Sequence, residues 1–216
     1  MNTLDYILNK FNLSFDDKTR MPIEIPNVGR DNLATLLHEL DFKTGVEVGV
    51  ADGKYSQIIL EANPQMELYG VDPWISYKGY RDTTEASIFN TGRENAKKRL
   101  SSSPNYEFIE EFSMYAVKKF QDESLDFVYI DANHEDPYVT QDITEWSKKV
   151  RSGGIISGHD FKRVQSRTFE MDWKVIDAVV NHVASNNIKC FFVWGLYHKI
   201  PGMIRDISRS WMIIKP

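Results

Sequence analysis

The sequence predicts a doubly wound α/β fold, in which a mostly parallel sheet of seven strands carries helices on both faces and has an antiparallel final strand. Strand-like and helix-like stretches alternate along most of the 216 residues, and parallel neighbours need such crossover connections. The first long apolar run, at 46–50, leads into a turn bounded by Gly49 and Gly53. Such a turn connects the first strand of a doubly wound sheet to its helix.

The elements follow from Arg30 onward. Residues 1–29 are interpreted as an N-terminal arm and residues 30–216 as one domain, because this length suits a single core. Leucines at helical spacing predict a helix directly after Arg30. The further strands are expected near 66–71, 106–110, 125–130, 153–158, 188–194 and 210–215, and the further helices from about 54 and near 85–101, 113–120, 136–149 and 173–185. We expect the last two strands to pair as an antiparallel edge hairpin, because no long helix separates them.

The composition narrows the class of protein. A net charge of -5 gives no field that would gather a polyanion, so nucleic acid is not an expected partner. The single cysteine, Cys190, cannot form an internal disulfide, which favours a reducing cytoplasm. No stretch has the pattern of a leader peptide or the length of a membrane span. We therefore expect a cytoplasmic protein with a small-molecule partner and no membrane contact; a homo-oligomer is compatible with the sequence.

The glycine turn and the next strand end predict a ligand site. The spacing of Gly49 and Gly53 departs from both the dinucleotide and the phosphate-loop patterns, which disfavours nicotinamide and nucleoside triphosphates. Glu47 is acidic within an apolar strand, a costly position unless a ligand or hydrogen-bond partner is near. Asp72 ends the second strand roughly 20 residues later, where an acidic residue can bind ribose hydroxyls. Trp74 adds an aromatic face, although a tight turn with a packing tryptophan is the alternative.

A second group of polar residues follows two later strands. Asp131 and His134 come after the strand at 125–130, and His159 and Asp160 after the strand at 153–158. Because parallel strands end at one edge of a sheet, we expect these four side chains to meet there. Two carboxylates and two imidazoles suit a general base or a divalent cation. A single histidine in a loop is more often a cap, but the joint placement favours a functional site.

The stretch Glu47-Val-Gly-Val-Ala-Asp-Gly53, together with Asp72, resembles the class I S-adenosylmethionine-dependent methyltransferases. The resemblance implies a Rossmann-like methyltransferase fold and S-adenosylmethionine as cofactor. In that family the glycine turn lies under the amino-acid part of the cofactor, the acidic strand end holds the ribose, and residues after the third strand border adenine. The cofactor-binding residues that it implies here are Glu47, Gly49, Gly53, Asp72, Trp74, Phe112, Ser113 and Asp131.

The Asp131-x-x-His134 spacing is similar to that of the macrocin O-methyltransferase-like enzymes, in which a magnesium site adjoins a histidine base. The similarity implies Asp131, His134 and His159 as catalytic residues and Asp131, His159 and Asp160 as metal ligands. His159 stands where such enzymes carry a carboxylate, which puts magnesium in doubt. A softer divalent metal that accepts an imidazole, or metal-free catalysis with His134 or His159 as the base, are the alternatives.

The expected function is O-methylation of a small hydroxylated acceptor, sugar-like or a natural product. We expect the acceptor to be selected by three irregular segments at this sheet edge, 77–84, 161–172 and 195–209, which are rich in basic and aromatic residues. Solvated loops are often equally basic. The alternatives are a non-catalytic module that binds the cofactor, or an enzyme of the same fold that uses the cofactor for another group transfer or a hydrolysis.

Overall fold

The computed structural model describes residues 1–77, 80, 85–166 and 171–216. The strands are β1 (Ile23–Ile25), β2 (Thr44–Val48), β3 (Glu67–Val71), β4 (Tyr106–Ile109), β5 (Leu125–Ile130), β6 (Val150–Gly158), β7 (Gln165–Ser166), β8 (Met171–Asp172), β9 (Phe192–Trp194) and β10 (Trp211–Ile214). The helices are α1 (Thr3–Lys10), α2 (Arg30–Glu39), α3 (Lys54–Ala62), α4 (Ala86–Leu100), α5 (Ser113–Ala116), the 3-10 helix η1 (Val117–Lys119), α6 (Tyr138–Lys149) and α7 (Val175–Ser185).

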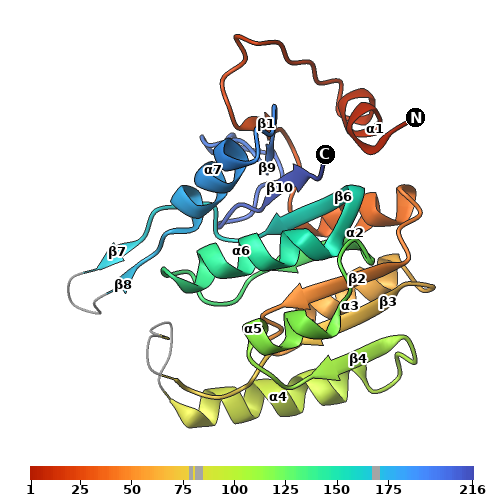
Figure 1. Ribbon diagram of the computed structural model, residues 1–216, viewed down its shortest axis with the longest axis vertical. Coiled ribbons are helices and arrows are strands. Elements are labelled where there is room, and N and C mark those ends of the chain that lie inside the picture. Colours follow the sequence, from red (N-terminus) through yellow and green to blue (C-terminus); the bar gives the residue numbers. More distant parts are fainter. Residues whose placement is uncertain (78–79, 81–84, 167–170) are drawn as a thin grey trace.

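The central sheet has the strand order β1-β9-β10-β6-β5-β2-β3-β4, with helices on both faces (Figure 1). All its pairs are parallel except those of β10, which runs antiparallel to both β6 and β9. The order reverses at β2, which pairs with β3 on one side and with β5 on the other. Ligands of doubly wound sheets bind in the crevice at such a reversal. The predicted doubly wound α/β fold is confirmed.

Two features of the sheet differ from the prediction. The sheet has eight strands instead of seven, because β1, from within residues 1–29, pairs in parallel with β9. β10 is also not part of an edge hairpin, since it lies between β9 and β6. Its residues Trp211, Met212 and Ile213 are fully buried, as expected for an interior strand. The domain boundary at residue 29 stays a prediction.

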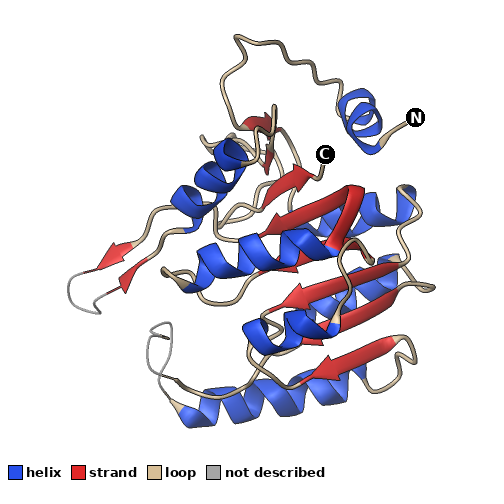
Figure 2. Cartoon of the chain, in the orientation of Figure 1, coloured by secondary structure: helices blue, strands red, loops and turns tan. Residues whose placement is uncertain are grey.

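The sheet separates two hydrophobic cores, with helices on each side (Figure 2). One core joins apolar residues of α1, α2 and α3 to one face of the sheet, and the other joins those of α6 and α7 to the opposite face. Along β5 the side chains alternate accordingly: Phe127 and Tyr129 belong to the first core, and Val128 and Ile130 to the second. Among the described residues, no helix combines the length and apolarity needed to cross a membrane.

Candidate active site

The ends of β2, β5 and β6 form one edge, where the arrowheads of β2 and β6 point the same way (Figure 1). Hydrogen bonds continue between these segments just beyond the strands. The Asp131 N–H donates to the Val48 carbonyl at 2.7 Å, and the His159 N–H donates to the Ile130 carbonyl at 3.1 Å. These bonds hold Asp131 beside the end of β2 and His159 beside the end of β5.

The turn after β2 requires glycine at its first position. Gly49 has a φ of 93°, and a Cβ atom added there would lie 2.2 Å from the carbonyl oxygen of Asp131. Only glycine allows this backbone conformation together with this approach. Gly53 has a φ of 77° and is the N-cap of α3, where an added Cβ would lie 3.0 Å from the Cα of Ala96. The two glycines therefore allow β2 and α3 to pack closely against their neighbours.

Asp72 and Trp74 fix the same turn from the end of β3. The Asp72 carboxylate accepts hydrogen bonds from the N–H groups of Val50 and Ala51, both at 3.0 Å, and of Trp74 at 2.8 Å. The indole N–H of Trp74 donates to the Ala51 carbonyl at 2.7 Å. Burial raises the pKa of Asp72 above its ordinary value, although the three backbone bonds favour its charged form. Asp72, the residue predicted to bind the ribose, therefore also holds the glycine turn in place.

A cavity of about 760 Å³ opens beside this turn, a volume within the range of small-molecule and cofactor sites. Its wall contains six of the eight predicted cofactor residues: Gly49, Asp72, Trp74, Phe112, Ser113 and Asp131. Glu47 and Gly53 do not line it. The cavity extends from the glycine turn to the aromatic side chains that follow β3 and β4. Six residues that the sequence predicts to bind the cofactor thus line one cavity, and their role in binding stays a prediction.

Glu47 lies beneath the turn instead of facing the cavity. Its side chain is 2% exposed and accepts a hydrogen bond from the Ser56 hydroxyl, which lies 3.0 Å from the Tyr106 hydroxyl. Burial raises the pKa of Glu47 to about 8. The acidic residue in the strand has therefore found a hydrogen-bond partner within the protein, one of the two outcomes that its burial required. A direct role of Glu47 in cofactor binding stays a prediction.

The raised pKa of Glu47 predicts a pH effect on stability. Between its ordinary pKa of 4.5 and about 8 the folded state binds more protons than the unfolded state, so this residue makes the protein less stable as pH rises. Glu47→Gln should remove that loss. The free energy of unfolding of the variant minus that of wild type should therefore be ~2–4 kcal/mol larger at pH 9 than at pH 5. Urea unfolding at both pH values measures this. Glu67→Gln, at an exposed position of β3, is the control; equal slopes for Glu47→Gln and wild type would contradict the prediction.

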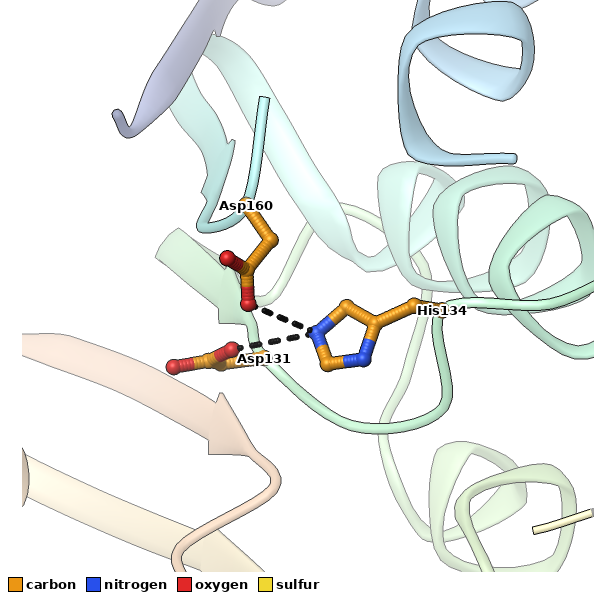
Figure 3. Close-up of side chains that lie close together, drawn as sticks. All are labelled: Asp131, His134 and Asp160. Atoms are coloured by element: carbon orange, nitrogen blue, oxygen red, sulfur yellow. Dashed lines mark ion pairs between the residues drawn. The ribbon is translucent and has the colours of Figure 1, made fainter. Parts of the chain in front are cut away.

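The four polar residues predicted to meet at the sheet edge do so. The Nε2 atom of His134 lies 3.1 Å from Asp160 Oδ2 and 3.5 Å from Asp131 Oδ1. Figure 3 shows the two carboxylates on the same side of the His134 ring. The Nδ1 atom of His159 lies 3.5 Å from Asp160 Oδ2 and 3.7 Å from Asp131 Oδ2. We call Asp131, His134, His159 and Asp160 the edge cluster. Two carboxylates thus face two imidazoles from adjacent strand ends.

Two further side chains hold the edge cluster in place. Trp173 stacks on the His134 ring, with centroids 4.2 Å apart, and Lys162 Nζ lies 4.7 Å from the Trp173 ring and 3.1 Å from Asp160 Oδ1. Asp160 has a φ of 54°, an uncommon left-handed conformation that often accompanies functional sites. Burial opposes ionisation of Asp160, but hydrogen bonds from His134 and His159 outweigh it and hold its pKa well below the ordinary value.

The edge cluster has a donor set that fits a divalent cation. Asp131, His134 and Asp160 each offer one ligand atom, and these atoms lie within 4.8 Å of one another. This set differs from the predicted one, which had His159 in place of His134. The sequence could not distinguish the two histidines, because both follow strands at the same edge and only the side-chain directions decide. Two carboxylate oxygens and one imidazole nitrogen suit metals softer than magnesium, such as manganese, iron or zinc.

Two further residues, which the sequence did not predict, lie at the site. Asp142 of α6 is 4% exposed and lines the cavity. It shares a helix face with Val139 and Trp146, so an acidic residue on an apolar face was the available signal. Arg30, at the start of α2, places its guanidinium 3.8 Å from Asp131 Oδ2 and over the Tyr55 ring. No sequence pattern connects Arg30 to Asp131, since their contact depends on tertiary packing.

The segments expected to select the acceptor are described in part. Residues 78–79 and 81–84 of the first segment and residues 167–170 of the second lie outside the described residues. Tyr77 and Tyr80 line the cavity, and Lys162 contacts the edge cluster. The third segment, 195–209, contacts the start of α2, where Asp206 accepts a hydrogen bond from the Arg30 N–H at 2.6 Å.

A sheet with this strand order, a glycine turn at the switch point and an acidic end on the next strand define a class I methyltransferase fold. The chain belongs to the family described as "Methyltransferase domain", whose profile matches residues 46–161. The predicted resemblance to class I methyltransferases is confirmed, and the macrocin-like subgroup stays a prediction. The comparison with curated proteins gave no significant match.

Solved structures share this fold at low sequence identity. The chain is similar to a "putative caffeoyl-CoA O-methyltransferase" from Staphylococcus aureus, with 13% identity, a TM-score of 0.60, and coverage of 98% of this chain and 90% of that one. Spermidine synthase from Thermotoga maritima has 12% identity and a TM-score of 0.56, over 88% of this chain and 58% of that one. A "putative O-methyltransferase" from Nostoc punctiforme has 14% identity and a TM-score of 0.57, over 86% and 55%. The chain thus spans little more than half of the last two.

Proposed function

We propose that the chain is an S-adenosylmethionine-dependent O-methyltransferase that acts on a small hydroxylated acceptor, either a sugar-like compound or another natural product. One observation carries the proposal: Asp131 belongs both to the wall of the cavity and to the edge cluster. A cofactor in the cavity would therefore end beside the groups that can take a proton from an acceptor. The family match and the similarity to structures titled as O-methyltransferases support the same function.

The order of the strands suggests how the cofactor lies. Ser113, Asp72, Gly49 and Asp131 follow β4, β3, β2 and β5, which are adjacent in that order. Strands are spaced by about 4.8 Å, so these ends span about 14 Å, a distance that suits an extended nucleoside with an amino-acid tail. Adenine would lie near Ser113, ribose at Asp72 and the amino-acid part at Gly49. The three hydrogen bonds to Asp72 leave one of its roughly four acceptor positions for a ribose hydroxyl.

Methyl transfer from a sulfonium is a displacement in line with the breaking bond, so the protein must align the acceptor and remove its proton. His134 would accept the hydroxyl proton, and the carboxylates of Asp131 and Asp160 would stabilise the imidazolium that forms. Lys162 and Trp173 would keep Asp160 and the ring in position. Alternatively, a divalent cation held by Asp131, His134 and Asp160 would supply a Lewis acid that acidifies the acceptor hydroxyl, and His134 would then be a ligand instead of the base.

Asp72→Ala is expected to weaken S-adenosylhomocysteine binding by at least ~30-fold, because it removes the ribose acceptor and frees the turn at Val50 and Ala51. Isothermal titration calorimetry measures the change. Asp41→Ala is the matched control, since the Asp41 side chain is 82% exposed and lies away from the cavity. If wild type binds neither S-adenosylmethionine nor S-adenosylhomocysteine, the proposed function is wrong.

Methyl-labelled cofactor with a panel of small hydroxylated acceptors tests the reaction itself. Label in an acceptor supports methyl transfer. Cofactor binding without transfer to any acceptor would favour a non-catalytic module, and transfer of another part of the cofactor would favour a different group transfer.

A further inference from the structure

The cavity wall contains a buried carboxylate that the proposed reaction does not use. Asp142 lies on α6 beside the apolar residues Val139, Ile143 and Trp146, and its side chain lines the cavity at 4% exposure. Among the described residues only the Ser113 hydroxyl donates a hydrogen bond to it. A carboxylate in such surroundings is costly unless it gains further partners. A ligand in the cavity can supply one.

The hydrogen bonds around Asp142 have a fixed direction. The indole N–H of Trp146 donates to Ser113 Oγ at 2.7 Å, so this oxygen accepts and its own proton is directed to Asp142 Oδ1. An indole N–H can only donate, which sets the polarity of the whole chain. Asp142 therefore offers the cavity an oxygen that accepts hydrogen bonds. Burial raises the pKa of Asp142 to about 7, although the hydrogen bond from Ser113 favours the charged form, and a ligand that donates a second hydrogen bond would favour that form further.

This end of the cavity also suits a flat ring. Phe112, Tyr77 and Tyr138 line it, and the Tyr77 ring lies 5.2 Å from Phe112 and 5.7 Å from Tyr138 in edge-to-face contacts. Ser113 follows β4, three strands from β5 and its Asp131, so Ser113 lies at the far side of the cavity from Asp131. Tyr77 reaches back toward β5, where its hydroxyl accepts a hydrogen bond from the Asn133 amide at 3.2 Å. A planar heterocycle between aromatic walls, with an amino group toward Asp142, matches these features.

We propose that Asp142 accepts a hydrogen bond from the 6-amino group of adenine, and thereby selects an adenine-containing cofactor over one with a 6-oxo purine. The inference rests on the proposed function, because it assumes that the cavity holds S-adenosylmethionine. It adds a residue on α6 that selects the base, whereas Asp72 would bind the ribose, which every such nucleoside has.

Calorimetry with two probes tests the inference. S-adenosylhomocysteine carries the 6-amino donor, and S-inosylhomocysteine carries a 6-oxo acceptor at the same position. Wild type is expected to bind the amino form at least ~30-fold more tightly, because the oxo group would face a buried acceptor. In Asp142→Asn the amide oxygen still accepts from Ser113 and the amide N–H₂ faces the base. The preference should then fall below ~3-fold or reverse.

Two further variants separate recognition from folding. Glu145→Gln changes an acidic residue of the same helix that pairs with Lys148 outside the cavity, and should keep the wild-type preference. Ser113→Ala removes the donor that orients the carboxylate, and should reduce the preference only in part. An unchanged ratio in a folded Asp142→Asn protein overturns this inference alone. Failure of wild type to bind either probe overturns the proposed function as well.

Discussion

His134→Gln is expected to lower kcat by about 10³, the usual contribution of a positioned general base. His134 is the imidazole that lies closest to both carboxylates of the edge cluster, at 3.1 and 3.5 Å. Glutamine preserves much of the side-chain volume but cannot take up a proton. Since His134 does not line the cavity, the Kd of S-adenosylhomocysteine should change less than ~3-fold. Turnover of labelled cofactor and calorimetry measure the two quantities.

His38→Gln is the matched control, because His38 is exposed on α2 and makes no contact with the edge cluster. A His134→Gln enzyme with more than a tenth of wild-type turnover would refute the assignment. A chelator distinguishes the two chemistries. If it abolishes turnover and a divalent cation restores it, His134 acts with Asp131 and Asp160 as a ligand. If turnover persists, His134 acts as a base without a metal.

Gly49→Ala is expected to destabilise the folded protein by about 3 kcal/mol or more. Alanine would adopt a φ of 93° and place its Cβ 2.2 Å from the Asp131 carbonyl oxygen. That oxygen cannot easily move away, because the Asp131 N–H is bonded to the Val48 carbonyl at 2.7 Å. Any shift would also displace the Asp131 side chain from His134. Both stability and turnover should therefore fall.

Gly202→Ala is a close control for this prediction. Gly202 has a φ of 83°, but nothing lies within 4 Å of an added Cβ. Alanine there should therefore lose only about 1 kcal/mol of stability, because of its unfavourable backbone conformation. Urea unfolding of both variants separates the close contact from the dihedral preference. Equal losses in the two variants would show that the approach of Gly49 to Asp131 is not what requires glycine.

The main elements of the sheet could be predicted because their signals are local. Apolar runs such as Leu125–Ile130 and the helical spacing of α2 are visible within a few residues. The strand Ile23–Ile25 in the N-terminal arm was missed because three residues are too few to show the alternation of apolar and polar residues that marks a strand. The interior position of Trp211–Ile214 was missed because strand order depends on contacts between distant segments.

Local sequence was enough to predict which strand-end residues reach this edge of the sheet. The Gly49 turn, the Asp72 strand end and the four residues of the edge cluster follow from the position of each residue relative to its own strand, since parallel strands end together. The directions of the side chains, in contrast, depend on how the helices and the sheet pack. Packing turned Glu47 toward Ser56 of α3, so that it does not line the cavity. It also placed His134 closer than His159 to the two carboxylates.

The structure also brought Asp142 of α6 to Ser113, 29 residues away. Side-chain direction and helix docking result from the packing of two cores against opposite faces of the sheet. That packing depends on contacts between segments far apart in the chain, which local spacing does not encode.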